Sequence, residues 1–434
     1  MQRILSFDMN PPLALPLRFF LTVPLFAALA AGLVLWQGDA ALATRWSPVT
    51  LALTHLLTLG CLTMAMIGAL LQILPVMAGI TVPGAARTGH AVHALLCAGT
   101  LLLAGAFLLQ WPWLFAPAML ALGACFLLLL GACTVGLWQQ YPSGADASLT
   151  AIRLALAALA VTVTMGLLLA AAYAFPGTLA LPLLALTDLH ATWGLLGWVG
   201  LLVIGVAFQV VPMFQVTDPY PRWLTGGYCT TLFLLLVAAS LSAGVAEPFR
   251  LASLGLLGLG YGGFALATLW LLAHRRRPVA DVTTFFWRCA LGCLLAALLA
   301  GLLPADGATD LARGVLLIVG FALAVINGML YKIVPFLTWY HLQHASDGRK
   351  DGVPGIQKII PVTHARAQFL LHCAALALLL AACFAPGLLA RPAAALLCVS
   401  CVALWINLWR ATRLYARLSR SLPAAQPCAV AAAH

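Results

Sequence analysis

The chain has 434 residues, of which 64% are hydrophobic and 8% are charged, and its formal net charge is +11. Soluble domains carry about 25% charged residues, so this composition excludes an ordinary soluble protein and indicates an integral membrane protein. The apolar runs are longer than the roughly 20 residues that a helix needs to cross the hydrocarbon of a bilayer. The alternating ten-residue strands of a membrane barrel are lacking, and we therefore expect an all-α polytopic fold.

Twelve transmembrane helices are predicted from the apolar runs and the breaks between them. In chain order the predicted spans are 13–36, 48–78, 89–109, 112–137, 150–175, 180–214, 224–246, 250–273, 284–303, 312–338, 364–386 and 391–411. Residues 340–363 are expected to form a cytoplasmic loop, and residues 422–434 a disordered cytoplasmic tail.

The basic residues predict the orientation of these spans. Four arginines lie in the loops of one side: Arg45, Arg250, Arg313 and Arg391. The other eighteen of the 22 Lys and Arg residues lie on the side of the N-terminus. This bias predicts that both termini are cytoplasmic. Orientation in the membrane explains the positive charge, so we expect membrane lipids and no nucleic acid as partners.

One sequence frame occurs in the second, sixth and tenth spans. It reads G-x7-G-x3-[QK]-[IV]-[LV]-P, and its three copies end in GALLQILP, GVAFQVVP and GMLYKIVP. The frame residues are Gly60, Gly68, Gln72 and Pro75, then Gly197, Gly205, Gln209 and Pro212, and finally Gly320, Gly328, Lys332 and Pro335. Small residues let neighbouring helices approach closely, and a proline ends or bends a helix. We interpret the frame as a packing and kinking device that locates the interior.

The spacing of the frame also predicts how the chain is organised. Consecutive frame prolines are 137 and 123 residues apart, and each interval holds about four spans. Self-similarity at such a period indicates repeated structural units. We therefore expect a single transmembrane domain over residues 1–421, built from three pseudo-threefold-related four-helix arcs. The three repeats cover about 13–137, 150–273 and 284–411.

Two histidines inside the spans are candidate cofactor ligands, because ionisable residues within a membrane are costly and are functional candidates by default. His55 lies in the second span and His190 in the sixth, both toward the outer side. Neutral imidazole is a common ligand of haem iron, copper and zinc. The alternative is that each imidazole only hydrogen bonds to a neighbouring helix. Their positions in the frame differ by two residues, about 200° on a helix, so we expect them in different cavities if each inner helix borders two.

Asp188 precedes His190 by two residues. It is a candidate acceptor for a hydrogen bond from a neighbouring imidazole, as metal-bound histidines usually require. The alternative is a carboxylate in contact with water at the outer mouth.

A second group of candidate metal ligands lies toward the cytoplasmic side. It forms one stripe of His90, His93 and Cys97 on the third span and another of His364, Gln368 and His372 on the eleventh. Side chains of these types bind copper or zinc, and His93 and His372 are the most plausible members. The alternative is that histidines at helix ends are simply solvated. The 12 cysteines lie almost all in apolar runs, where free thiols packed as small hydrophobic groups are expected.

Twelve spans in three arcs of four, with ligand histidines on the second and sixth helices, resemble subunit I of the haem–copper oxidase superfamily. Within that group the chain is most similar to the NnrS family of haem- and copper-containing bacterial membrane proteins. The first span of that family opens with an Arg-Pro-Phe-Phe-like element, which Arg18-Phe19-Phe20 resembles without the proline. Its second span begins with histidine and ends in a Gly-x3-Thr-Ala-Val-Pro-like run. His55 and the run from Gly68 to Pro75 match that spacing.

The resemblance implies haem (heme) and/or copper as cofactors, with His55 and His190 as ligands. It further implies the bacterial inner membrane, a redox partner protein, and a role in nitric-oxide or redox stress or in respiratory metal handling. The chain departs from the oxidases because its seventh and tenth spans contain no intramembrane histidine. Arg313 stands at the position comparable with His190, and Val315 at the one comparable with His55. We therefore expect no complete binuclear centre and no terminal oxidase activity.

Two other functional readings remain open from the sequence. One is a membrane transporter or permease, in which the histidines and Asp188 relay protons or metal ions. The other is a cofactor-free structural or assembly partner of a respiratory complex, which the missing histidines favour. Transporters commonly carry two related halves rather than three repeats.

Overall fold

The structure is a computed structural model, and it describes residues 10–139, 146–243, 245–304, 306–346 and 353–421. These residues are largely helical and contain no β-strand. Within them, 11 helices are long and apolar enough to cross a membrane. The expectation of an all-α polytopic membrane protein is thereby confirmed. The tail expected at 422–434 lies outside the described residues.

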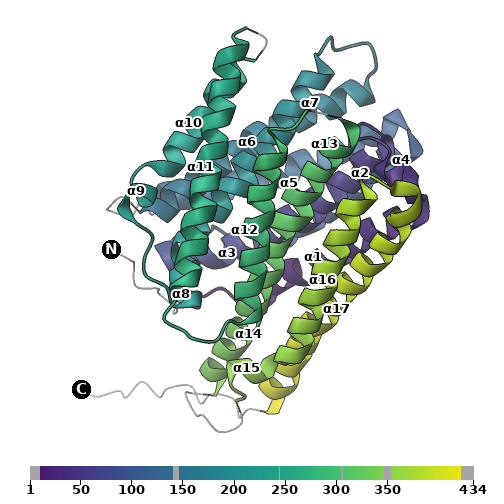
Figure 1. Cartoon of the computed structure of the whole chain (residues 1–434). Helices are drawn as coiled ribbons and strands as arrows, with labels where there is room; N and C mark the ends of the chain where they lie inside the picture. Colours follow the sequence, from purple (N-terminus) through teal and green to yellow (C-terminus); the bar gives the residue numbers. More distant parts are fainter. Residues whose placement is uncertain (1–9, 140–145, 244, 305, 347–352, 422–434) are drawn as a thin grey trace.

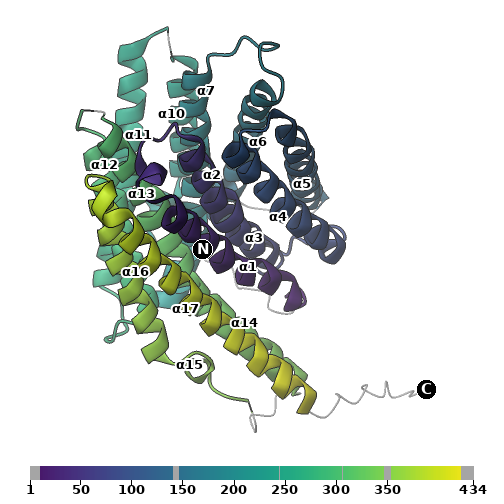
Figure 2. The ribbon, with the colours of Figure 1, turned by 90° about the vertical axis from the view of Figure 1, so that its right-hand side faces the viewer.

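The helices follow one another along the chain as Figures 1 and 2 show. The first part contains α1 (Ala14–Gln37), the short 3₁₀ helix η2 (Gly38–Leu42), α2 (Pro48–Leu57), α3 (Met64–Ala78), α4 (Ala85–Leu109) and α5 (Pro112–Gln139). The middle part contains α6 (Ala147–Ala174), α7 (Leu183–Thr192), α8 (Leu201–Gln215), α9 (Arg222–Thr225), α10 (Tyr228–Leu241) and α11 (Glu247–Ala273). The last part contains α12 (Val282–Ala300), α13 (Gly307–Val315), α14 (Ala324–Ala345), α15 (Ile356–Ile359), α16 (Val362–Ala382) and α17 (Pro386–Ser421).

Three π-helical segments interrupt the inner helices. They are η3 (Thr58–Thr63) between α2 and α3, η4 (Trp193–Gly200) between α7 and α8, and η5 (Leu316–Leu323) between α13 and α14. Each segment ends twelve residues before the frame proline, as the pairs Thr63 and Pro75, Gly200 and Pro212, and Leu323 and Pro335 show. Because π-helical turns are rare in proteins, their common position is a further likeness between the three copies of the frame.

At the frame glycines, each inner helix packs closely against the long helix that precedes it in the chain. The side chains nearest to an added Cβ are Phe26 and Phe19 of α1 at Gly60 and Gly68, Ala158 and Ala151 of α6 at Gly197 and Gly205, and Cys293 and Phe286 of α12 at Gly320 and Gly328. In every copy the two partners are seven residues apart, which is about two turns of an α-helix. The glycines therefore act as the packing device that the sequence predicts.

In two of the three copies, the polar residue of the frame ties the inner helix to the start of the preceding one. The Gln72 side-chain amide donates a hydrogen bond of 2.6 Å to Asn10, just before α1. Lys332 forms an ion pair with Asp281, which caps α12 by accepting a hydrogen bond of 2.9 Å from the backbone N–H of Thr284. Burial alone would raise the pKa of Asp281. Lys332 and the Thr284 hydrogen bonds outweigh that effect and hold the pKa below its usual value of 3.8.

Two helices continue about ten residues or more at their ends beyond an expected stopping point. Helix α14 continues ten residues past Pro335 to Ala345, so the first part of the expected loop 340–363 is helical. No glycine or proline interrupts that stretch, and the ring of His344 stacks on that of Tyr340 one turn earlier. Helix α17 likewise continues to Ser421, well beyond the predicted end of the last span.

The contacts between helices run around the whole molecule. α5 contacts α6, α11 contacts α12, and α17 returns to contact α1. In both views α16 and α17 run side by side (Figures 1 and 2). In the middle of the inner helices η5 contacts both η3 and η4. The three π-helical segments are therefore gathered together rather than scattered.

Candidate functional site

A cavity of about 210 Å³ lies between the helices of the first part and those of the middle part. Its walls come from α2, η3, α4, α5, α6, α7 and η4, with Ile318 added from η5, and most of the lining side chains are apolar. The lining includes Leu103, Phe107, Met119, Phe126, Leu159, Val163, Leu195 and Val199. His55 and His190 both line this cavity, and they are the lining side chains with ring nitrogens suited to bind a metal.

The two imidazoles face each other across the cavity. Their ring centres are 6.3 Å apart and their planes are inclined by 23°. The ring of His55 also stacks on Phe107, with a centre-to-centre distance of 5.5 Å. The expectation that the two histidines occupy different cavities is therefore wrong. It assumed 100° per residue along the inner helices, whereas η3 and η4 separate each histidine from its frame proline and have a different helical repeat.

Each imidazole is held through one nitrogen and leaves the other available. Nδ1 of His55 lies 2.8 Å from the carbonyl oxygen of Leu51, and Nδ1 of His190 lies 3.0 Å from that of Thr162. A carbonyl oxygen only accepts, so Nδ1 carries the proton in both rings and Nε2 keeps its lone pair. This is the arrangement found in metal-binding histidines, where the second nitrogen fixes the tautomer and the ring orientation.

Gly166 of α6 makes room for the His190 ring. A Cβ built on this glycine would lie 2.9 Å from Cε1 of His190, closer than real side chains approach. Sequence reasoning did not identify Gly166, because it lies outside the repeated frame and nothing in its neighbourhood marks it.

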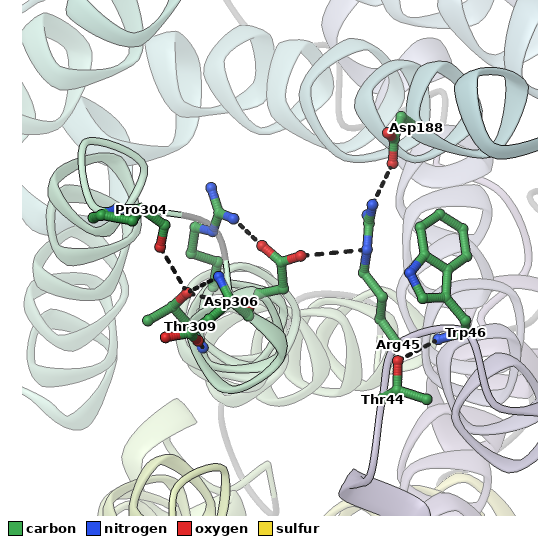
Figure 3. A network of polar contacts seen from close by, with 9 residues as sticks. Thr44, Arg45, Trp46, Asp188, Pro304, Asp306 and Thr309 are labelled. Carbon is green, nitrogen blue, oxygen red and sulfur yellow. Dashed lines mark hydrogen bonds and ion pairs between the residues drawn. The ribbon is translucent and has the colours of Figure 1, made fainter.

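Figure 3 shows a network of charged side chains around Arg45, the residue before Trp46 of the cavity lining. Arg45, just before α2, lies 2.8 Å from Asp188 of α7 and 3.5 Å from Asp310 of α13. Asp310 also pairs with Arg313 on the same helix. The Arg45 guanidinium lies 4.0 Å from the ring centre of Trp46, and Trp46 lines the cavity. The network thus joins helices from all three parts of the chain.

This network settles the partner of Asp188. Its carboxylate accepts a hydrogen bond from Arg45 and none from an imidazole among the described residues, so the expectation that Asp188 orients an imidazole is wrong. Both histidines use backbone carbonyls instead, which α-helices supply at short range. Asp188 points away from His190 because residues two apart lie on opposite sides of a helix. Arg45 could be read from the sequence only as an outer-loop cation.

The first stripe of the second candidate group lies on α4. His93 hydrogen bonds to Thr22 through Nε2 at 2.9 Å, and the Cys97 sulfur lies 3.9 Å from the same nitrogen. His90 is exposed and bonds through Nδ1 to the carbonyl of Ala86 one turn earlier. His93 and Cys97 are therefore in contact, and His90 points to a different partner.

The second stripe lies on α16. His364 is exposed and hydrogen bonds to Arg410 of α17 at 3.3 Å, whereas His372 is fully buried. Across the described residues, no group of three or more His, Cys, Asp or Glu side chains is placed to hold a metal ion. The two stripes therefore do not combine into one multi-ligand site, and metal binding by their members stays a prediction.

Comparison with known proteins adds no assignment. No protein-family model matches the chain, and a search of curated proteins finds no match.

Proposed function

We propose that this protein is a haem-binding integral membrane protein in which His55 and His190 would hold the haem iron. The observation that carries the proposal is the pair of imidazoles whose ring centres are 6.3 Å apart. Metal–nitrogen bonds to imidazole are about 2.0–2.1 Å long, so two imidazoles whose ring centres lie 6.3 Å apart are near enough to bind one metal ion between them. The separation fits this arrangement.

The residues around the two rings also fit a haem. The lining is apolar and aromatic, as cofactor pockets usually are. The volume of about 210 Å³ is below the roughly 300–1,000 Å³ of pockets that enclose a whole ligand, so a macrocycle would be partly enclosed. The cavity opens where its lining side chains are exposed, at Trp46 (38%) and Tyr173 (42%).

Bound haem supplies one-electron oxidation and reduction, whose potential the axial ligands and the surrounding polarity set. In this site the carbonyls of Leu51 and Thr162 orient the two imidazoles and fix their tautomers. Phe107 packs against the His55 ring, and the apolar lining keeps water away from it. The chain's own contribution is a rigid, dry pair of ligands, which suits electron transfer or redox sensing.

The resemblance to the oxidase fold and the NnrS family supports the same proposal. The repeated frame, the common position of the π-helical segments and the cyclic contacts of α5 with α6, α11 with α12 and α17 with α1 support three four-helix arcs about a central axis. Helix α10, with 14 residues, would then be the twelfth span. Arginines at the end of α17 support cytoplasmic termini in a bacterial inner membrane.

A terminal oxidase is not part of the proposal. Helix α10, all of whose residues are described, contains no histidine. The histidines of α14, His341 and His344, lie near the end of that helix. Among the described residues that line the cavity, there is no third or fourth imidazole for a neighbouring copper ion. A role in nitric-oxide or redox stress, with an electron-transfer partner protein, agrees with the two ligands present.

The test is the visible spectrum of the purified protein with and without dithionite. A Soret band with α and β bands on reduction is expected, and His55→Ala and His190→Ala are each expected to remove or shift it. His274→Ala is the matched control, because His274 also bonds to the carbonyl four residues earlier, at 2.9 Å, but lies outside the cavity. A spectrum unchanged in both cavity variants would overturn the proposal. A colourless, metal-free protein that also fails to bind added haemin would favour the cofactor-free assembly partner.

A further inference from the structure

A second cavity, here called the inner cavity, lies among the three inner helices. It has a volume of about 80 Å³ and lies between α3, α8 and α14. Phe20 of α1 and Trp287 of α12 complete its walls. The lining residues are buried, except for the partly buried Ala69, Val206 and Ile333. The inner cavity is therefore enclosed by the core of the helix bundle.

The three inner helices line the inner cavity with equivalent positions of the repeated frame. The residue two before the second frame glycine lines it in every copy, as Met66, Val203 and Ile326. The residue one after that glycine also lines it in every copy, as Ala69, Val206 and Met329. Both positions lie about 100–160° around the helix from the glycine. The inner cavity therefore lies where the three copies of the frame face one another.

The frame glycines explain why space remains at this point. A Cβ added to Gly68, Gly205 or Gly328 would lie 2.7, 2.5 or 2.6 Å from a side-chain Cβ of α1, α6 or α12. Each inner helix is thus held close to its outer neighbour, and side chains alone must fill the centre. At the position after the glycine, α3 contributes only Ala69, whereas the other two copies carry Val206 and Met329. The short side chain of Ala69 leaves part of the centre unfilled.

The walls of the inner cavity offer very few hydrogen-bonding groups. Among the described side chains that line it, only the indole of Trp287 carries an N–H donor, and none carries an oxygen acceptor. A buried water needs two to four polar partners, so water does not suit this site. A lipid acyl chain would need an open side toward the membrane, which the buried lining does not provide. Met66 and Met329 add polarizable thioethers, which favour contact with small apolar molecules by dispersion.

We propose that the inner cavity binds an apolar diatomic gas, dioxygen or nitric oxide. Apolar cavities in proteins stay dry, and one of roughly 150 Å³ binds benzene or xenon. A volume of about 80 Å³ suits a smaller molecule of the same apolar class. A diatomic gas needs no hydrogen-bond partner, and it can reach an enclosed site because side chains hop between rotamers.

The inner cavity lies next to the cavity of His55 and His190 along the inner helices. Val199 lines the cavity of the two histidines, and Val203, about one turn further along, lines the inner cavity. Gas held there would be stored one helical turn from the haem site, and this role as a store rests on the proposed function. Binding of the gas itself does not depend on haem.

The first experiment measures the relaxation of methionine methyl groups by NMR in the intact, detergent-purified protein. Dioxygen and nitric oxide are both paramagnetic, so a bound molecule broadens the methyl resonances nearest to it. Relative to the same sample under argon, we expect either dissolved gas to broaden Met66 and Met329 several-fold more than Met64. Met64 is the matched control, because it is fully buried on the same helix as Met66 and lines neither cavity. Extra broadening in only one of the two gases identifies the gas that the site takes.

Two variants fill the inner cavity with residues that the other copies of the frame already carry. Ala69→Val copies Val206, and Ala69→Met copies Met329. The two substitutions should progressively remove the extra broadening of Met66, with an unfolding temperature equal to or above that of wild type because they fill existing space. Ala98→Met is the control, since Ala98 is exposed on α4, and it should leave the broadening unchanged.

Displacement by xenon tests the same site without any variant. Xenon is apolar and diamagnetic, so pressurising the wild-type sample with xenon should reverse the extra broadening. Equal broadening of Met66 and Met64 in both gases would overturn the proposal, and so would extra broadening that persists unchanged in Ala69→Met. His55→Ala should leave the broadening unchanged, so failure of the gas site and failure of the haem site are distinguishable.

Discussion

The indole N–H of Trp198 donates a hydrogen bond of 3.2 Å to the hydroxyl of Thr63, and so joins two π-helical segments that are 135 residues apart in the sequence. Both side chains are buried, and both line the cavity that holds His55 and His190. π-Helical turns occur frequently at functional sites. The bond therefore fixes the two irregular segments against each other beside the candidate ligands.

Thr63→Val is expected to destabilise the protein by about 1–3 kcal/mol, because the variant keeps the shape of the side chain but leaves a buried N–H unsatisfied. The double variant Trp198→Phe with Thr63→Val leaves no buried donor unsatisfied. Its loss of stability should therefore not exceed the loss in Thr63→Val added to the loss caused by the smaller ring. Thermal unfolding in detergent measures the difference. Equal stability of wild type and Thr63→Val would show that the bond contributes nothing.

Gly205→Ala tests the close approach of α8 to α6. The added Cβ would lie 2.5 Å from Cβ of Ala151, so the helices must separate, and overpacking of this kind costs about 1–3 kcal/mol. Gly105→Ala is the control, because no atom lies within 4 Å of its added Cβ and alanine favours a helix interior by about 1 kcal/mol. We expect a lower unfolding temperature in the first variant and an unchanged or higher one in the second. Equal stability of the two variants would contradict the packing role of the frame.

Gly166→Ala should perturb the haem site without removing a ligand. The new methyl group would push the His190 ring from its position, since it would lie 2.9 Å from Cε1. We expect a shifted Soret band or a lower haem content at nearly unchanged unfolding temperature. Gly123→Ala is the control, because the nearest atom to its added Cβ is 3.8 Å away, on Leu167. Identical spectra of the two variants would contradict a role of His190 in holding the haem.

The pair of Asp281 and Lys332 predicts a dependence of stability on acid pH. The folded pKa of Asp281 is lowered from 3.8, so the ionised carboxylate stabilises the folded state. Its contribution is fully present above pH 3.8 and is lost as the pH falls through the lower folded pKa.

Asp281→Asn should therefore unfold at a lower temperature than wild type near neutral pH, and the gap should close as the pH falls below 3.8. Asparagine also caps helices well, so the variant isolates the charge. Asp146→Asn changes the equivalent cap of α6, where Gln209 holds the position of Lys332 in the frame. Its difference from wild type should be smaller. If the difference in unfolding temperature between Asp281→Asn and wild type is constant from neutral pH to pH 3, the charge of Asp281 does not stabilise the fold.

Arg45→Ala should have only a small effect on stability, although Arg45 links three parts of the chain. The Arg45 and Asp188 side chains are 37% and 54% exposed, and exposed ion pairs contribute about 0–1 kcal/mol. We expect a change within that range that shrinks further in high salt. Arg250→Ala, which breaks a pair within one helix, is the control. A loss of several kcal/mol from Arg45→Ala alone would mean that the network is more strongly shielded than its exposure indicates.

The sequence alone determined the class of the protein and the location of its inner helices. Long apolar runs with few charges have one stable arrangement in a bilayer, the helix, because every backbone polar group must be satisfied internally. The frame could also be recognised from the sequence. Gly60 and Gly68, and their counterparts in the other two copies, leave space for the preceding helix in every copy. His55 and His190 were identifiable as candidates because a histidine within a membrane span is rare.

Only the tertiary structure decided which of these side chains meet. His55 faces His190 because the π-helical segments change the rotation per residue along the inner helices. The apolar residues of these segments carry no sequence signal for that change. Arg45 with Asp188, and Trp198 with Thr63, come from segments far apart in the chain. Such pairs are set by how helices pack against each other, and residue spacing within a single helix does not contain that information.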